Sequence, residues 1–168
     1  MLITGFVLAG LCLFEAIAGP SQRNVGFPIS QTVSEISLKV ETAKKDRVYS
    51  KSEPVVLKFS VTNNAKKTIY LHESCPTLDY RLVVRGEDGS VPKLTSEGLR
   101  MTNRNEVICK SRKLRVDSTS AVYSTLNVGA LFELSANRSY SVIVKRSIYL
   151  GSGKWDELIS DPIKIQIL

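Results

Sequence analysis

The side chains with the clearest chemical potential in this 168-residue chain are one tyrosine with two cations behind it and a single histidine. Tyr140 is followed by Lys145 and Arg146. A lysine one helical turn after the tyrosine would hold its charge beside the phenol and lower the pKa of that phenol. That position holds Val144 instead. The spacing therefore favours a structural role for Tyr140 over a catalytic one.

The only histidine, His72, lacks the partners that the familiar catalytic and metal-binding motifs require. A hydrolytic triad needs a nucleophile beside its histidine, and the chain has no G-x-S-x-G turn. His72-Glu73 begins like the H-E-x-x-H zinc motif, yet Pro76 stands where the second histidine belongs. We therefore expect a protein that is not an enzyme and that uses no metal or cofactor. The alternative is an enzyme whose site is assembled from scattered loops.

Four cations within six residues form a pattern that is typical of anion binding: Lys110, Arg112, Lys113 and Arg115. The run S-R-K-L-R-V fits the X-B-B-X-B-X pattern associated with heparin-like polyanions. Each contact with a sulfate or phosphate releases counterions, so such binding weakens steeply with salt. On a strand, however, Arg112 faces away from Lys113 and Arg115, and basic residues also protect exposed strand edges from aggregation. The stretch is either an anion-binding surface or a solvated edge.

The segment from 96 to 108, S-E-G-L-R-M-T-N-R-N-E-V-I, is the longest run without turn signals or clean alternation. It predicts a long loop, and long loops inside compact domains are often functional. Leu99, Arg100 and Met101 are its candidate binding residues, in the manner of an inhibitor that presents a loop to a protease. Alternatively, Leu99 and Met101 are ordinary core residues. Trp155, near an expected hairpin tip, is either a partner-facing aromatic or a core residue.

The first 18 residues predict a cleaved secretory signal peptide. An apolar run too short to cross a bilayer is followed by Ala16-Ile17-Ala18, an A-x-A cleavage signal. An uncleaved anchor is the alternative, but Gly5, Gly10 and the shortness of the run argue against it. Without residues 1–18 the chain loses one acid, Glu15, and its net charge becomes 23 − (16 − 1) = +8. We expect a secreted or periplasmic protein with no stable membrane span, and no nucleic-acid partner.

Two cysteines stay in the mature chain, Cys75 and Cys109, because Cys12 leaves with the signal peptide. An even pair in an oxidising compartment most simply forms one disulfide. A redox or metal pair is the alternative, but the chain has no C-x-x-C motif and a single histidine. The sequence therefore predicts a structural Cys75–Cys109 bond.

The remaining chain is predicted to comprise a flexible leader, residues 19–31, and one domain, residues 32–168. The leader mixes Pro, Gly and polar residues without a period, whereas the domain shows repeated alternation of apolar and polar residues. Strands are expected near 36–40, 55–61, 68–72, 80–84, 91–94, 121–126, 140–144 and 163–167, with a hairpin turn at 87–90 and a short helical turn at 131–134. Seven to eight short strands without an amphipathic helix predict an all-β, antiparallel, two-sheet immunoglobulin-like sandwich.

Leu134 and Tyr140 stand six residues apart across a turn at the start of an expected strand. This L-x-x-x-x-x-Y arrangement resembles the tyrosine corner of fibronectin type III and immunoglobulin-like domains. The resemblance implies that the Tyr140 ring is buried where the chain changes sheets and that its hydroxyl bonds to the backbone a few residues upstream. Both residues are therefore given a structural role.

A second resemblance covers E-P-V-V-L-K-F-S-V-T-N-N, then D-Y-R-L-V-V and D-G-S-V-P, within residues 53–95. A strand that ends in Thr-Asn before a hairpin closed by Asp-Gly is similar to the layout of the Bacillus intracellular proteinase inhibitors. This chain departs from that layout in its signal peptide, its cysteine pair and Leu82, which replaces the hairpin's aromatic. The resemblance implies the sandwich fold, and it identifies no inhibitory residue.

Together these features predict a secreted, non-catalytic binding module. The leading hypothesis is recognition of an extracellular or periplasmic protein, including an inhibitor-like mode. The alternative is a basic adhesion module that binds anionic polymers of the envelope or matrix. Neither the oligomeric state nor the choice between the 96–108 segment and the basic stretch follows from the sequence.

Overall fold

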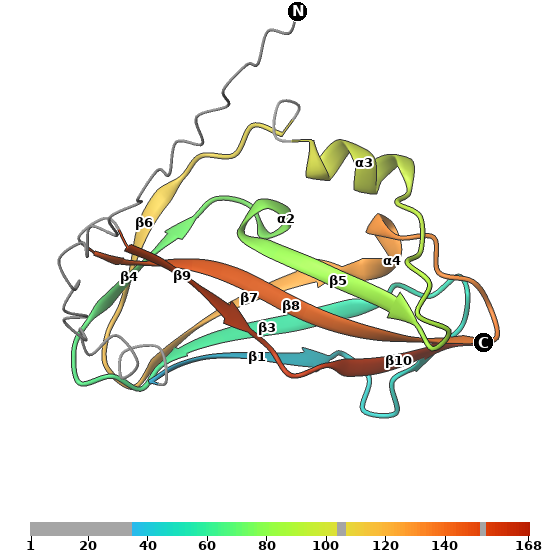
Figure 1. The fold of residues 1–168 in the computed structure, drawn as a ribbon, viewed down its shortest axis with the longest axis horizontal. Helices are drawn as coiled ribbons and strands as arrows, with labels where there is room; N and C mark the ends of the chain where they lie inside the picture. Colours follow the sequence, from blue (N-terminus) through green and yellow to red (C-terminus); the bar gives the residue numbers. More distant parts are fainter. Residues whose placement is uncertain (1–34, 104–106, 152–153) are drawn as a thin grey trace, which may run out of the picture.

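The structure, a computed structural model, describes residues 35–103, 107–151 and 154–168. The predicted signal peptide (1–18) and leader (19–31) lie outside these residues. The described residues form two layers of β-sheet packed face to face, with three short helices at one edge (Figure 1). No helix among them has both the length and the apolar composition needed to cross a membrane. The predicted all-β sandwich is confirmed.

The first layer is an antiparallel sheet of three strands in the order β1-β3-β7. Its members are β1 (Ile36–Thr42), β3 (Val56–Asn63) and β7 (Ser120–Asn127). The alternation that predicted β3 places Leu57, Phe59 and Val61 in the core at 0–1% exposure. The other face of β3 includes Lys58 and points outward. Lys39 of β1 and Tyr123 of β7 lie on the same outer face of the sheet.

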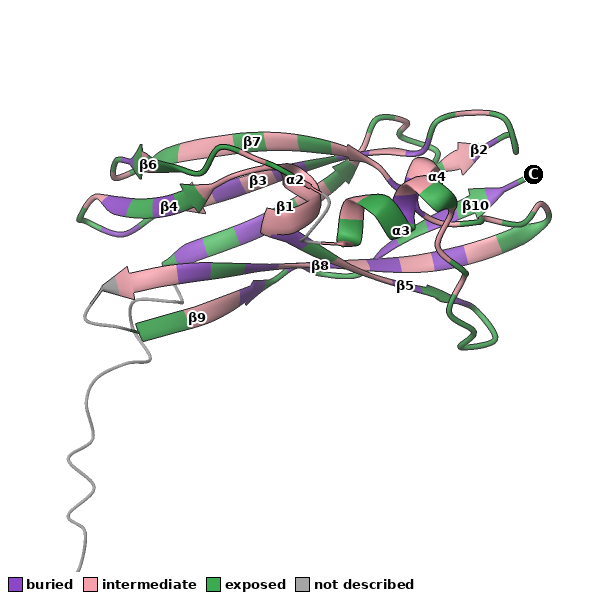
Figure 2. Cartoon of the chain, turned by 90° about the horizontal axis from the view of Figure 1, so that it is seen from above, coloured by how far each residue is buried: buried purple, intermediate pink, exposed green. Residues whose placement is uncertain are grey.

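The second layer is built around β8, the longest strand (Figure 2). It consists of β2 (Val48–Tyr49), β10 (Ile163–Ile167), β8 (Arg138–Gly151), β5 (Tyr80–Gly86) and β9 (Lys154–Ile159). β10 pairs with the first part of β8, and β9 pairs with its second part. One pairing departs from the predicted antiparallel sheet, because β2 runs parallel to β10.

A two-stranded ribbon of β4 (Ile69–Glu73) and β6 (Arg112–Val116) completes the β structure. β4 packs beside β8. The corner where β3 leads into β4 is held by Asn63, which is fully buried and donates from its side-chain amide to the carbonyls of Lys67 and Val116 at 2.9 and 3.0 Å. This amide satisfies main-chain carbonyls that would otherwise be buried without a partner at the bend. The ribbon is thereby fixed at one end of the sandwich.

Ten strands occur in the described residues, where the sequence predicted seven or eight. The prediction missed β2, β6 and β9, and it wrongly placed a strand at 91–94. The turn that precedes this segment forms as expected, with Gly89 at φ +78°. However, β5 pairs with β8 instead of with the returning chain, and Leu94 makes only an isolated bridge to Phe132. Asp-Gly can form a tight turn without selecting the strand that follows it.

Three short helices pack at the open edge between the two layers: α2 (Pro76–Asp79), α3 (Ser96–Thr102) and α4 (Val128–Leu131). The prediction of a long loop over 96–108 is therefore wrong for its first half. Thr95 caps α3, because its side-chain oxygen accepts the N–H of Gly98 at 2.9 Å. The expected helical turn at 131–134 lies three residues earlier, as α4.

Candidate binding surface

A buried arginine holds the β4–β6 ribbon against the second layer. Arg146 is only 2% exposed, and it donates to the Tyr80 hydroxyl and, at 3.0 Å, to the main-chain carbonyl of His72. Its guanidinium also lies 4.6 Å from the centre of the Tyr80 ring, within cation–π range. None of the ion pairs among the described residues includes Arg146. β4 is thus positioned by hydrogen bonds from a desolvated cation, and such bonds are stronger than neutral ones.

Three aromatic rings lie together on the outer face beside this anchor. Tyr149 of β8 and Trp155 of β9 are direct cross-strand partners, and their ring centres are 5.2 Å apart. The centre of the His72 imidazole on β4 lies 6.1 Å from that of the Trp155 ring. Trp155 is nevertheless 60% exposed. The indole is therefore held by neighbouring rings while most of its surface remains accessible to a partner.

Cations continue this surface across the ribbon. Lys113 of β6 lies directly opposite His72, and its Nζ is 4.1 Å from the centre of the Tyr70 ring. Arg115 lies opposite Tyr70 in the same register. We call this surface the aromatic–cationic face; it consists of Tyr70, His72, Lys113, Arg115, Tyr149 and Trp155. It crosses four strands, β6, β4, β8 and β9, from three separate parts of the sequence.

Carboxylates neutralise some, but not all, of the cations around this face. Arg112 pairs with Glu73 at 2.6 Å and Arg115 with Asp117 at 2.8 Å. The hydrogen bond from Arg115 lowers the pKa of the Asp117 carboxyl, so this acid stays ionised. Lys113 is held by a ring instead of by a carboxylate. Both ion pairs are exposed and contribute little to stability, so an anionic partner can replace the carboxylates at small cost.

The structure brings together only part of the predicted basic stretch. Lys113 and Arg115 share the outer face of β6, whereas Arg112 is directed to the other side and pairs with Glu73, as the strand parity predicted. Lys110 is exposed and precedes the strand. The four cations therefore do not converge on one site. The sequence pattern indicated the cations, but not the aromatic rings from β4, β8 and β9 that accompany them.

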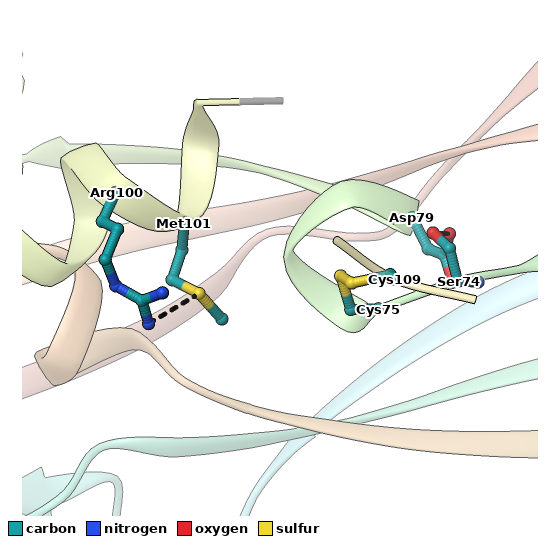
Figure 3. Close-up of a disulfide and its surroundings, with 6 residues drawn as sticks. All are labelled: Ser74, Cys75, Asp79, Arg100, Met101 and Cys109. Carbon is teal, nitrogen blue, oxygen red and sulfur yellow. Dashed lines mark hydrogen bonds between the residues drawn. A yellow bond between two sulfur atoms is a disulfide. The ribbon is translucent and has the colours of Figure 1, made fainter. Parts of the chain in front are cut away.

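The other predicted binding residues lie apart from this face, on α3 (Figure 1). Leu99 is 60% exposed, whereas Met101 is half-buried. Arg100 forms an ion pair with Glu97 at 2.8 Å and donates to the Met101 sulfur at 3.4 Å (Figure 3). The core alternative is thus wrong for Leu99. A helix does not offer the extended main chain with which strand-type ligands bind, so this segment is not preformed as an inhibitory loop.

The predicted disulfide is present. Cys75, at the N-terminus of α2, is bonded to Cys109, and their Cα atoms are 5.8 Å apart (Figure 3). Next to it, the Asp79 carboxylate accepts the N–H and the hydroxyl of Ser74 at 2.8 and 2.6 Å. The bond ties the chain leaving β4 to the chain entering β6. It therefore fixes the ribbon at the end opposite to the Asn63 corner.

Tyr140 has the geometry that its spacing from Leu134 predicts. Its ring is 2% exposed, and its hydroxyl accepts the N–H of Ser135 at 2.8 Å. Leu134 packs against the core as a partly buried residue. This hydrogen bond ties the Tyr140 side chain to the turn that leads into β8.

A mainly apolar crevice of about 290 Å³ lies beneath the helices, between β5 and the end of β7. Its lining includes Leu82, Leu131 and Phe132, together with Tyr80 and Arg81. Burial raises the pKa of the Tyr80 phenol, so this group keeps its proton at neutral pH. The described residues also contain no group of three or more His, Cys, Asp or Glu side chains that could hold a metal ion.

Comparisons with known proteins place the chain in no family. No family model and no curated protein matches the sequence. Similar solved structures include a CARDB domain of the PF1109 protein from Pyrococcus furiosus, solved with di-metal ions. It is 6% identical to this chain, the match covers 79% of this chain and 87% of that chain, and the TM-score is 0.43. The structural genomics target SoR45 is 11% identical over 79% of this chain and 84% of its own, with a TM-score of 0.41.

A third similar structure is Bacteroides uniformis beta-glucuronidase 2, bound covalently to cyclophellitol-6-carboxylate aziridine. It is 12% identical, the match covers 73% of this chain and 12% of that chain, and the TM-score is 0.35.

Proposed function

We propose that this protein is a secreted, non-catalytic binding module that recognises another extracellular or periplasmic protein through the aromatic–cationic face. The observation that carries the proposal is Trp155, which is 60% exposed although the rings of Tyr149 and His72 lie beside it. Tryptophan, tyrosine and arginine dominate the energetic centres of protein interfaces. A tryptophan already held in place loses little side-chain entropy on binding.

The disulfide and the predicted signal peptide support the proposed location. Disulfides persist in oxidising compartments, so the Cys75–Cys109 bond supports export from the cytoplasm. The partner is expected to carry an acidic patch, because Lys113 and Arg115 flank the rings and the whole chain has a net charge of +7.

Site-specific crosslinking tests this proposal even though the partner is unidentified. A photo-reactive amino acid replaces Trp155 in one variant and Tyr123 in the control. Tyr123 is a suitable control because it is 77% exposed on the outer face of the other layer. After incubation with proteins secreted by the same cells, we expect one crosslinked protein from position 155 and none from position 123.

Competition with unlabelled protein then tests whether Trp155 is part of the binding surface. Unlabelled wild-type protein should suppress the crosslink, whereas Trp155→Ala should need about 30-fold more protein, since truncating a central aromatic costs about 2 kcal/mol or more. Equal crosslinking from both positions, or equal competition by Trp155→Ala, would contradict the proposal.

A second candidate function, adhesion to an anionic polymer, is favoured by the placement of Lys113 and Arg115 on one face of β6. Its test is salt elution from a sulfated-polysaccharide column. Lys113→Ala with Arg115→Ala is compared with Lys39→Ala with Lys58→Ala, which removes the same charge from the outer face of the other layer. Earlier elution of the first variant alone supports a polymer site. Equal elution of the two variants means that only net charge matters.

A further inference from the structure

The strand β6 presents an unpaired edge. It hydrogen-bonds to β4 on one side, and no described strand pairs with it on the other. None of its five residues is proline, so no position of the free edge lacks a main-chain N–H donor. In Figure 1 this strand (yellow) lies at the rim of the molecule. An edge of this kind is a template on which another strand can be added.

The charges along β6 decide which strand can be added. Arg112, Lys113 and Arg115 occupy three of its five positions, and all three are exposed. A second copy paired through the same edge would bring these cations opposite one another, and like charges directly opposite are destabilising. An acidic strand would instead place carboxylates opposite Lys113 and Arg115. The edge therefore disfavours self-association and favours an anionic extended segment.

The position of the edge links it to the aromatic–cationic face. Lys113 and Arg115 point to the outer face, where Tyr70 and His72 lie on the adjacent strand β4. A strand added to β6 would extend the same sheet, so its outward side chains would continue the row of residues across β6 and β4. Alternate residues of the added strand would face the cations, and those between them would face the opposite side.

We propose that β6 binds an acidic, extended segment of the partner protein by β-strand addition, with carboxylates of that segment opposite Lys113 and Arg115. The proposal deepens and rests on the function proposed above. Main-chain hydrogen bonds to β6 supply the attachment, and the alternating charges set the register. The exposed cations Arg112, Lys113 and Arg115 disfavour edge-to-edge pairing of two copies in the absence of the partner.

The probe is a fluorescent seven-residue peptide that alternates glutamate with valine and threonine, with both ends blocked. Its binding to the full chain is followed by fluorescence anisotropy at low and at physiological salt. A matched peptide carries N-methyl groups on the amides of one edge, which keeps all charges but removes the donors needed for strand addition. We expect binding of the first peptide and at least a tenfold weaker binding of the second.

Charge reversal tests the register. Lys113→Glu with Arg115→Glu should weaken binding of the acidic peptide about tenfold or more and allow binding of a lysine version of it. Lys39→Glu with Lys58→Glu is the control, since it makes the same change in net charge on the other layer. Slower amide hydrogen exchange in residues 112–116 on adding the acidic peptide would locate the contact.

Equal binding of the plain and N-methylated peptides would overturn strand addition. So would equal effects of the two charge reversals, or the absence of peptide binding at low salt. None of these results alters the crosslinking from position 155, so they leave the proposed function standing. Conversely, strand addition without a crosslink from position 155 would remove the aromatic rings from the interface.

Discussion

Replacing Gly98 in α3 by alanine should destabilise the protein, although the same change stabilises most helices. An ideal Cβ at this position would lie 2.1 Å from the main-chain oxygen of Leu131 in α4. A carbon–oxygen contact needs about 3.3 Å, so the two helices must separate by about 1 Å. Two hydrogen bonds at this contact would then stretch, from the Thr95 N–H to the Leu131 carbonyl (3.0 Å) and from the Thr95 hydroxyl to the Ala130 carbonyl (2.5 Å).

The two stretched bonds are worth about 1 kcal/mol each, and alanine returns about 1 kcal/mol of helix propensity. With the residual strain of the contact, we expect Gly98→Ala to lower the free energy of unfolding by about 1 to 3 kcal/mol. Urea unfolding followed by circular dichroism measures this quantity. Leu99→Ala is the control, because Leu99 is 60% exposed and its truncation should cost less than about 1 kcal/mol. If Gly98→Ala proved neutral or stabilising, the close approach of α3 to α4 would be refuted.

Three further predictions concern stability. Tyr140→Phe should lower the free energy of unfolding by about 1 kcal/mol in urea titrations and leave crosslinking unchanged; normal stability with lost crosslinking would contradict its structural role. Replacing Cys75 and Cys109 by serine should cost about 3 to 4 kcal/mol on the chain-entropy model, measured against the oxidised protein. The hydrogen bond from Lys145 lowers the pKa of the Glu157 carboxyl in the folded protein. The ionised Glu157 therefore contributes its full stabilisation above the ordinary glutamate pKa, and this contribution is lost as the pH falls through the lowered pKa. Acid unfolding curves of Glu157→Gln should therefore be less steep than those of the wild type as the pH falls below the ordinary glutamate pKa.

The two layers were predictable because β1, β3 and β10 bury every second residue. Ile36 and Leu38, or Ile163 and Ile165, alternate with exposed residues in the sequence and in the structure alike. The role of Tyr140 was equally predictable, since its spacing from a leucine is a local signal. Each of these features lies within a few consecutive residues, where the side-chain period of the strand is visible directly.

Other features depend on contacts between distant segments and could not be predicted from local patterns. The β4–β6 pairing joins residues more than 40 positions apart, for example Ile69 and Val116. The position of α3 depends on its contact with α4, and its seven residues are too few for a clear helical period. The aromatic–cationic face was missed for the same reason, because its residues come from four strands.

The buried arginine, in contrast, follows from strand parity. Tyr140, Val142 and Val144 point inward, and the same parity places Arg146 inward too. A cation in that position predicts buried polar partners, which the structure provides in Tyr80 and His72. The buried position of Arg146 could therefore be predicted from the sequence. Which strand this arginine holds in place could not.

The disulfide between Cys75 and Cys109 would also hold the protein together after proteolytic cleavage of its main chain. The covalent loop includes α3, whose Leu99 is exposed to any protease in the surroundings. A single cut within that loop would divide the backbone, yet the two fragments would remain joined through the cystine and through β5 in the sheet. The molecule would migrate as one species until a reductant was added, and its ribbon would stay in place. The bond thus makes the fold tolerant of a cut within α3.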